Sequence, residues 1–160
     1  MGPSLVDRHA HHDIHDAARA DVEAGTELLH ASLGSQDNAT TVRLARELAN
    51  GWRQRVLAHA DAEEQDVFPQ VVEHLPEQRA AVAALIRDHQ LMRLLVAEVE
   101  QELLRKERVT RAVLDRFAAL LHVQRLHSVF EEENFLPQIS GALSPARQRS
   151  KEGPKPWPNA

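Results

Sequence analysis

The sequence predicts an all-α fold, an antiparallel up-down-up-down four-helix bundle. In four long stretches, apolar residues recur at steps of three and four, which is the periodicity of one helix face. Short links containing glycine, proline or polar residues separate these stretches, so consecutive helices should run antiparallel. Histidines and glutamates fall in line with the apolar stripes, which predicts polar groups inside the bundle.

The first helix is expected over about residues 13–33, ended by Gly34 and a polar loop. Residues 1–12, which include Gly2 and Pro3, are expected to form a flexible lead-in to this helix. The face of this helix that should point to the core is only weakly apolar, because it contains a glycine. The stripe comprises Ile14, Ala18, Val22, Gly25, Leu29 and Leu33.

The second helix should begin at a cap formed by Thr40 or Thr41 and continue to about Phe68. Pro69 should end or bend it, because proline lacks the N–H of a helical residue, and residues 70–76 are expected to form a short connection. The apolar stripe runs directly into a histidine and a glutamate, so these polar residues should face the core. The stripe comprises Leu48, Trp52, Val56, His59, Glu63 and Val67.

The third helix is expected over residues 77–106, and the fourth begins after a charged turn with Thr110 as its cap. The bundle would thus occupy residues 13–143. The stretch 144–160 is rich in proline and basic residues and should lack regular structure. The third stripe comprises Val82, Leu85, His89, Met92, Val96, Val99 and Leu103, and the fourth Val113, Phe117, Leu120, Gln124, His127, Glu131 and Asn134.

One motif occurs twice, near the ends of the second and fourth helices. In each copy a histidine is followed four and five residues later by a pair of glutamates, and ten residues later by a proline. Positions four apart lie on one helix face, so each histidine and its first glutamate point the same way. Such a pair can bind a metal ion. The copies consist of His59, Glu63, Glu64 and Pro69, and of His127, Glu131, Glu132 and Pro137.

Antiparallel packing indicates which residues face the two motifs. Because both motifs lie near the carboxyl ends of their helices, their partners must come from the amino-terminal parts of the first and third helices. His89 is the only histidine of the third helix and lies on its core stripe. On the first helix we favour His15, because its distance from His59 along the chain is then similar to that of His89 from His127. His11, one turn earlier on a similar face, stays open as the alternative.

Four histidines and two glutamates in one core need partners, because buried imidazoles and carboxylates are costly when unpaired. Six ligands are too many for one tetrahedral zinc, and calcium or magnesium would not select imidazole. The set predicts two first-row ions bridged by Glu63 and Glu131, with iron preferred over manganese or zinc, and with room for oxide or hydroxide. The expected ligands are His15, His59, Glu63, His89, His127 and Glu131, with His11, Glu64 and Glu132 as less certain ones.

Composition excludes several other classes of protein. The chain has 160 residues, a formal net charge of −5 and no cysteine, so thiolate zinc sites, iron–sulfur clusters and cysteine nucleophiles are absent. No basic cluster is combined with stacking aromatics, which argues against nucleic acid as a partner. No apolar run has membrane length and the amino terminus lacks a secretory core, so no membrane partner and a cytoplasmic location are expected.

The chain resembles the hemerythrin-like proteins of the HHE cation-binding family over residues 11–140. The resemblance rests on the two motifs, with their prolines, and on the isolated His89. It implies a four-helix bundle with a non-haem diiron centre that meets dioxygen, peroxide or nitric oxide. Two positions depart from the oxygen carriers of the family. Arg93 stands where they have a second histidine, and Glu132 lies as far from His127 as their last carboxylate lies from its histidine. Glu131 is still preferred as the bridge, because it continues the core-facing stripe of the fourth helix.

Two functions from different classes follow from this resemblance. In the first, a redox enzyme consumes peroxide or another small oxidant, in a catalase-like manner, in oxidative or nitrosative stress or in iron homeostasis. In the second, a non-catalytic module senses or stores iron or oxygen. A bundle whose histidines bind nothing is the structural alternative. A bundle of this size is expected to work as a monomer or a homodimer.

Overall fold

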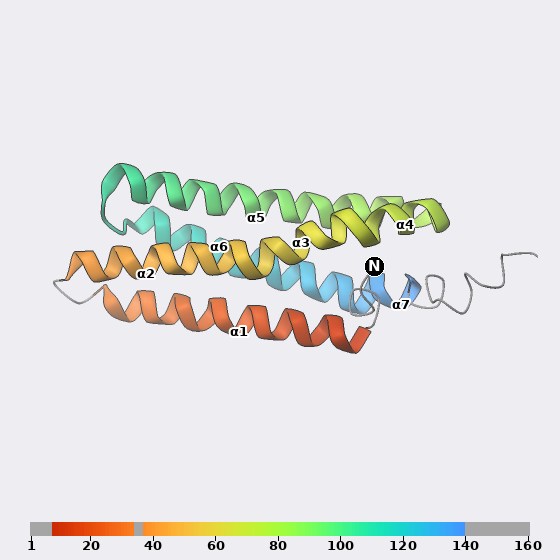
Figure 1. Ribbon diagram of the computed structural model, residues 1–160, viewed down its shortest axis with the longest axis horizontal. Helices are drawn as coiled ribbons and strands as arrows, with labels where there is room; N and C mark the ends of the chain where they lie inside the picture. The colour runs from red at the N-terminus through yellow and green to blue at the C-terminus, as the bar shows by residue number, and fades with distance from the viewer. Residues whose placement is uncertain (1–7, 34–36, 140–160) are drawn as a thin grey trace, which may run out of the picture.

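The computed structural model describes residues 8–33 and 37–139, and they form the expected antiparallel four-helix bundle (Figure 1). No strand occurs within these two ranges. The first bundle helix is α1 (Arg8–Ser32), and the third is η4 (Pro76–Gln78) followed by α5 (Arg79–Lys106). The second bundle helix comprises α2 (Asn38–Gly51), η2 (Trp52–Leu57), α3 (Ala58–Ala62), η3 (Glu63–Val67) and α4 (Phe68–His74). The fourth bundle helix comprises α6 (Arg111–Phe130), η5 (Glu131–Phe135) and α7 (Leu136–Ile139).

Neighbours in the bundle follow the order of the chain. Helix α1 packs on α2 and α6, and α5 packs on α6 and α2, so the four bundle helices close a ring around one core. The turn between α5 and α6 lies at the same end of the molecule as the carboxyl end of α1 and the start of α2 (Figure 1). The amino-terminal parts of α1 and α5 therefore lie beside the carboxyl-terminal parts of the second and fourth bundle helices, as the sequence predicted.

The helix starts differ in part from those expected. Helix α1 begins at Arg8 rather than near residue 13, so residues 8–12 of the expected lead-in are helical, and residues 1–7 lie outside the described residues. The cap of α2 is Asp37, whose side chain accepts a hydrogen bond from the backbone N–H of Thr40 at 3.0 Å, and neither threonine is the cap. An aspartate one turn before the first buried residue serves this role as well as threonine. The Thr110 cap is confirmed, since its hydroxyl accepts from the N–H of Val113.

Pro69 does not end the second bundle helix, which continues to His74, so the expected connection over residues 70–76 is wrong. The preceding segment η3 is a π-helix in which the N–H of Phe68 donates to the carbonyl of Glu63, five residues back. A proline ring in a regular α-helix clashes with the carbonyl four residues earlier. The wider π turn displaces that carbonyl, and the helix passes through the proline without ending.

The fourth bundle helix also has a π turn directly before a proline. In η5 the N–H of Leu136 donates to the carbonyl of Glu131, and Pro137 follows at once. Of the three π segments described, η3 and η5 thus begin at the first glutamate of a motif, whereas η2 precedes His59. π-Bulges are frequent at functional sites because they re-aim the side chains around them.

Two apolar clusters fill the core, one on each side of the histidine level. The larger cluster includes Trp52, Val96 and Phe117, and the smaller one includes Phe68, Leu85 and Phe135. The histidines of each bundle helix that were expected to bind metal lie between the two clusters. Among the described residues, no helix combines the length and the apolar character needed to span a membrane. The stretch 144–160, expected to be irregular, and residues 140–143 of the expected bundle lie outside the described residues.

Candidate metal centre

All six side chains expected to bind metal point into one buried region between the two apolar clusters, and His11 joins them. The side chains of Glu63 and Glu131 are only 1% exposed, although carboxylates are almost never fully buried without partners. His59 lies closest to the surface, with 12% of its side chain exposed. The buried residues of this centre are His11, His15, Glu63, His89, His127 and Glu131.

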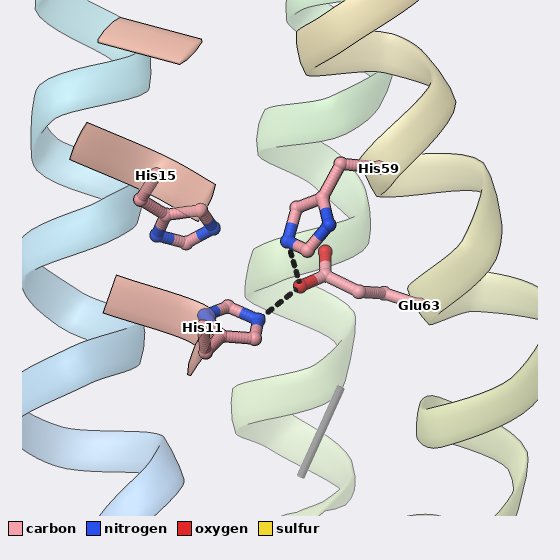
Figure 2. A group of neighbouring side chains, drawn as sticks. All are labelled: His11, His15, His59 and Glu63. Atoms are coloured by element: carbon pink, nitrogen blue, oxygen red, sulfur yellow. Dashed lines mark hydrogen bonds and ion pairs between the residues drawn. The ribbon is translucent and has the colours of Figure 1, made fainter. Parts of the chain in front are cut away.

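Glu63 lies in the middle of the centre. Its Oε1 accepts a hydrogen bond from Nε2 of His11 at 2.7 Å and lies 2.9 Å from Nε2 of His59 (Figure 2). Its other oxygen, Oε2, lies 3.4 Å from Nε2 of His89. One carboxylate therefore faces three bundle helices, with its two oxygens directed to different histidines.

Glu131 is the corresponding carboxylate of the fourth bundle helix. Its Oε2 lies 3.4 Å from Nε2 of His127 and 3.5 Å from Nε2 of His15, and its Oε1 lies 3.9 Å from Nε2 of His11. The two glutamates thus approach the same His11 nitrogen from the second and fourth bundle helices.

The donor atoms fall into two groups that share one residue. In each group the nitrogen and oxygen atoms lie within 4.8 Å of one another, which is the spacing around a single metal ion. The Nε2 atoms of His89 and His127, in the second group, are only 3.3 Å apart. One group consists of His11, His15, His59 and Glu63, and the other of Glu63, His89 and His127.

His11 and His15 enter the centre together, one turn apart on α1 (Figure 2). The sequence predicts one partner from each helix, which leaves the two histidines as alternatives. Their spacing of four residues was the available signal, since such a pair faces one direction as His59 and Glu63 do. The structure therefore brings seven side chains together where six were expected.

Unpaired buried atoms indicate that the donor set suits a cation. Five nitrogen or oxygen atoms of the centre are buried without a hydrogen-bond partner among the described residues. Leaving such atoms unpaired is destabilising, and a metal ion would satisfy those that face the other donors, namely His59 Nε2, Glu63 Oε2 and Glu131 Oε2. These atoms are His11 Nδ1, His59 Nε2, Glu63 Oε2, His127 Nδ1 and Glu131 Oε2.

The two carboxyl groups differ in their affinity for protons. Burial raises the pKa of Glu131 above its usual value, and the nearby charge of Glu63 raises it further, although His127 opposes both effects. Burial acts on Glu63 in the same direction, but the hydrogen bond with His11 and the close approach of His59 outweigh it and hold the pKa of Glu63 well below its usual value. Glu63 is therefore the carboxylate that stays ionised.

The histidines also differ in the direction in which their pKa values are shifted. Burial and the neighbouring His11 lower the pKa of His15 to about 2, and burial together with His127 lowers the pKa of His89. Burial opposes charge on His11 and His127 too, but Glu63 raises the pKa of the first and Glu131 that of the second. His15 and His89 are thus neutral imidazoles, the form that binds metal.

Glu64 and Glu132 lie behind the histidines. Glu64 Oε1 lies 2.8 Å from Nδ1 of His89, and Glu132 Oε1 lies 3.1 Å from Nδ1 of His15. Each carboxylate faces the ring nitrogen that points away from the centre. Neither belongs to the two donor groups. Their place one residue after each motif glutamate turns them outward by about 100° on the helix.

Arg93 points away from the donor groups. Its guanidinium donates to Glu64 at 2.9 Å and to Asp61 at 2.5 Å, so it ties α5 to the second bundle helix. The chain of contacts from Arg93 through Glu64 to His89 fixes the orientation of that ring. Four histidines outside the centre are exposed, namely His12, His30, His74 and His122.

Fold and site together define a class: an all-α bundle whose core carries a layer of histidine and carboxylate donors for cations. The chain matches the family model described as the hemerythrin HHE cation binding domain over residues 7–139. It therefore belongs to the hemerythrin HHE cation-binding family, and it is a metal-binding module. No significant match was found among curated proteins or among solved structures.

Proposed function

We propose that the centre holds two iron ions and binds or reacts with a small oxidant, namely dioxygen, peroxide or nitric oxide. The observation that carries this proposal is the position of Glu63, which belongs to both donor groups and directs one oxygen to each. A carboxylate shared in this way suits a pair of ions better than a single one.

Each proposed ion would have its own set of side chains. His11, His15 and His59 with Glu63 Oε1 would hold the first ion, and His89 and His127 with Glu63 Oε2 would hold the second. Glu131 lies between His15 and His127 and would form a second bridge. Mixed imidazole and carboxylate donors suit iron, and iron bound there would supply redox chemistry towards dioxygen, peroxide or nitric oxide.

The two groups are unequal, since the first contains three histidines and the second two. Fewer protein donors in the second group leave more of its coordination sphere free for an external ligand. The protein's own part is to keep the donors neutral and in place. Glu64 and Glu132 do this by accepting hydrogen bonds from the outer nitrogens of His89 and His15, which fixes each ring with its other nitrogen directed inward.

Metal analysis and an optical spectrum of anaerobically purified protein test this proposal. We expect two irons per chain and, after exposure to air, the absorption of an oxo-bridged pair. One zinc per chain would overturn it. Rapid release of gas from added peroxide would assign an enzyme, whereas a lasting ligand-bound spectrum with slow turnover would assign the alternative, a sensing or storage module.

A further inference from the structure

One layer of side chains lies directly beneath the histidines, on the side of the larger apolar cluster. Each bundle helix contributes one residue, which lies three positions along the chain from a histidine of the centre, in the direction of the larger apolar cluster. All four side chains are buried, and three are apolar. The layer consists of Ala18, Val56, Met92 and Gln124, which follow or precede His15, His59, His89 and His127 respectively.

A small cavity separates this layer from the histidines. It has a volume of about 20 Å³, and its walls include all four layer residues and all four of those histidines. A single water molecule needs about 10–15 Å³ on this measure, so the cavity admits a molecule of one or two heavy atoms. A ligand there would touch both donor groups from the interior of the bundle.

Gln124 is the polar exception in the layer. Its side chain is buried at 3% exposure, and its Nε2 donates to the hydroxyl of Ser128 at 3.3 Å. Its Oε1 is buried with no hydrogen-bond partner. The equivalent residue of the other hairpin is Val56, so the packing of this level does not itself require an amide. A buried acceptor that stays unpaired destabilises the fold, which a ligand with a proton to donate would correct.

We propose that Oε1 of Gln124 accepts a hydrogen bond from a small O–H-bearing ligand in this cavity, and that Gln124 thereby selects hydrogen peroxide over dioxygen or nitric oxide. This inference rests on the proposed function and names its ligand. Hydrogen peroxide has two heavy atoms and two protons to donate. Dioxygen and nitric oxide have none, and would leave the amide oxygen unpaired, which is how a polar pocket rejects an analogue lacking the hydrogen-bonding group.

Gln124→Leu tests the proposal, because it removes the acceptor and leaves an apolar side chain of similar size. Gln101→Leu makes the same chemical change at an exposed site on α5 and serves as the control. In iron-loaded protein, the optical response to rising peroxide, followed by stopped flow, gives an apparent dissociation constant. We expect Gln124→Leu to weaken peroxide binding about tenfold, the effect of losing one hydrogen bond, while titration with nitric oxide gives equal or tighter binding.

The metal-free protein supplies a second readout. If the acceptor is present for a ligand and not for packing, metal-free Gln124→Leu should unfold at a temperature equal to or above that of the wild type. A marked fall in that temperature, a loss of iron, an unchanged response to peroxide, or equal weakening of peroxide and nitric oxide would each overturn the role of Gln124. A wild-type protein that binds no iron pair, or that responds to neither ligand, would instead overturn the proposed function and this inference with it.

Discussion

Nε2 of His11 lies 2.7 Å from Oε1 of Glu63, which ties the start of α1 to the π segment of the second bundle helix. The same oxygen lies 2.9 Å from Nε2 of His59. A single carboxylate atom therefore brings together two histidines from two bundle helices before any ion is considered. The geometry of the first donor group depends on it.

Glu63→Gln should remove metal from both groups, because the amide keeps the shape of the side chain but loses the charge that both groups share. We expect affinity to fall by more than the ~10–100-fold that follows loss of a residue behind the ligands. Metal content after gel filtration measures this. Glu23→Gln, at an exposed position of α1, is the matched control. Full metal content in Glu63→Gln would contradict the shared position.

His11→Ala and His15→Ala should each lower metal content, since both rings lie in the first donor group. His122→Ala removes an exposed histidine and should have no effect. Elemental analysis of the three variants, prepared in parallel, decides the matter. If only His15→Ala loses metal, then His11 acts on Glu63 alone and is no ligand.

Acidification should destabilise the metal-free protein through His15. Its pKa falls from 6.5 to about 2 because of burial and the neighbouring His11, so below pH 6.5 the unfolded chain binds a proton that the folded chain does not. Stability is then lost as pH falls, by up to about 1.4 kcal/mol per pH unit. His11 and His127, whose pKa values are raised by Glu63 and Glu131, oppose this slope near pH 6.5, where the unfolded imidazole is still partly neutral, and cease to do so at lower pH.

The pKa of Glu131 is raised by burial, so it acts in the opposite direction and partly masks the slope. His15→Gln separates the two effects. Urea unfolding at about pH 6.5 and about pH 5.5 should give a smaller loss of stability for this variant than for the wild type. Equal losses in both proteins would mean that His15 is not held neutral in the fold.

Gly51→Ala and Gly25→Ala should have different effects, although both glycines are helical. A Cβ at Gly51 meets no atom within 4 Å, so alanine there should stabilise the fold by about 1 kcal/mol through helix propensity. A Cβ at Gly25 would come within 2.8 Å of Cδ1 of Leu48, and moving that side chain offsets the gain. Thermal unfolding of the pair tests this; equal gains would show that Leu48 moves freely.

Thr110→Ala should cost about 1 kcal/mol, because the hydroxyl accepts the N–H of Val113 at the start of α6. Thr110→Ser keeps the acceptor and should retain most of the stability. The urea midpoints of the two variants give the comparison. A loss of the same size in both would place the effect in the threonine methyl group instead of the cap.

The bundle was predictable because its stripes are long and regular. Helix starts were predicted less well, since several polar residues before a stripe can act as caps and Asp37 competes with two threonines that follow it. The continuation of the helix past Pro69 was not predictable from local rules. A proline normally breaks the α-helical hydrogen-bond pattern, and only the π turn that begins at Glu63 shows how the chain avoids this.

The centre was predictable where the motif repeats and less so where it does not. His59, Glu63, His127 and Glu131 carry identical offsets, so their convergence followed from antiparallel packing. The joint presence of His11 and His15 depends on how far α1 extends towards its amino terminus, and α1 begins at Arg8, before the start near residue 13 that the sequence predicts. The free acceptor of Gln124 depends on side-chain orientation, which no spacing in the sequence reveals.

The first donor group lies entirely within the hairpin of α1 and the second bundle helix, whereas the second group takes His89 and His127 from the other hairpin. During synthesis on the ribosome, the first half of the nascent chain therefore carries a complete set of three imidazoles and a carboxylate before the second half has emerged. The second set forms only when the two hairpins dock. The two donor sets should therefore form in a fixed order, because the first lies within one hairpin and the second lies at the interface between the two hairpins.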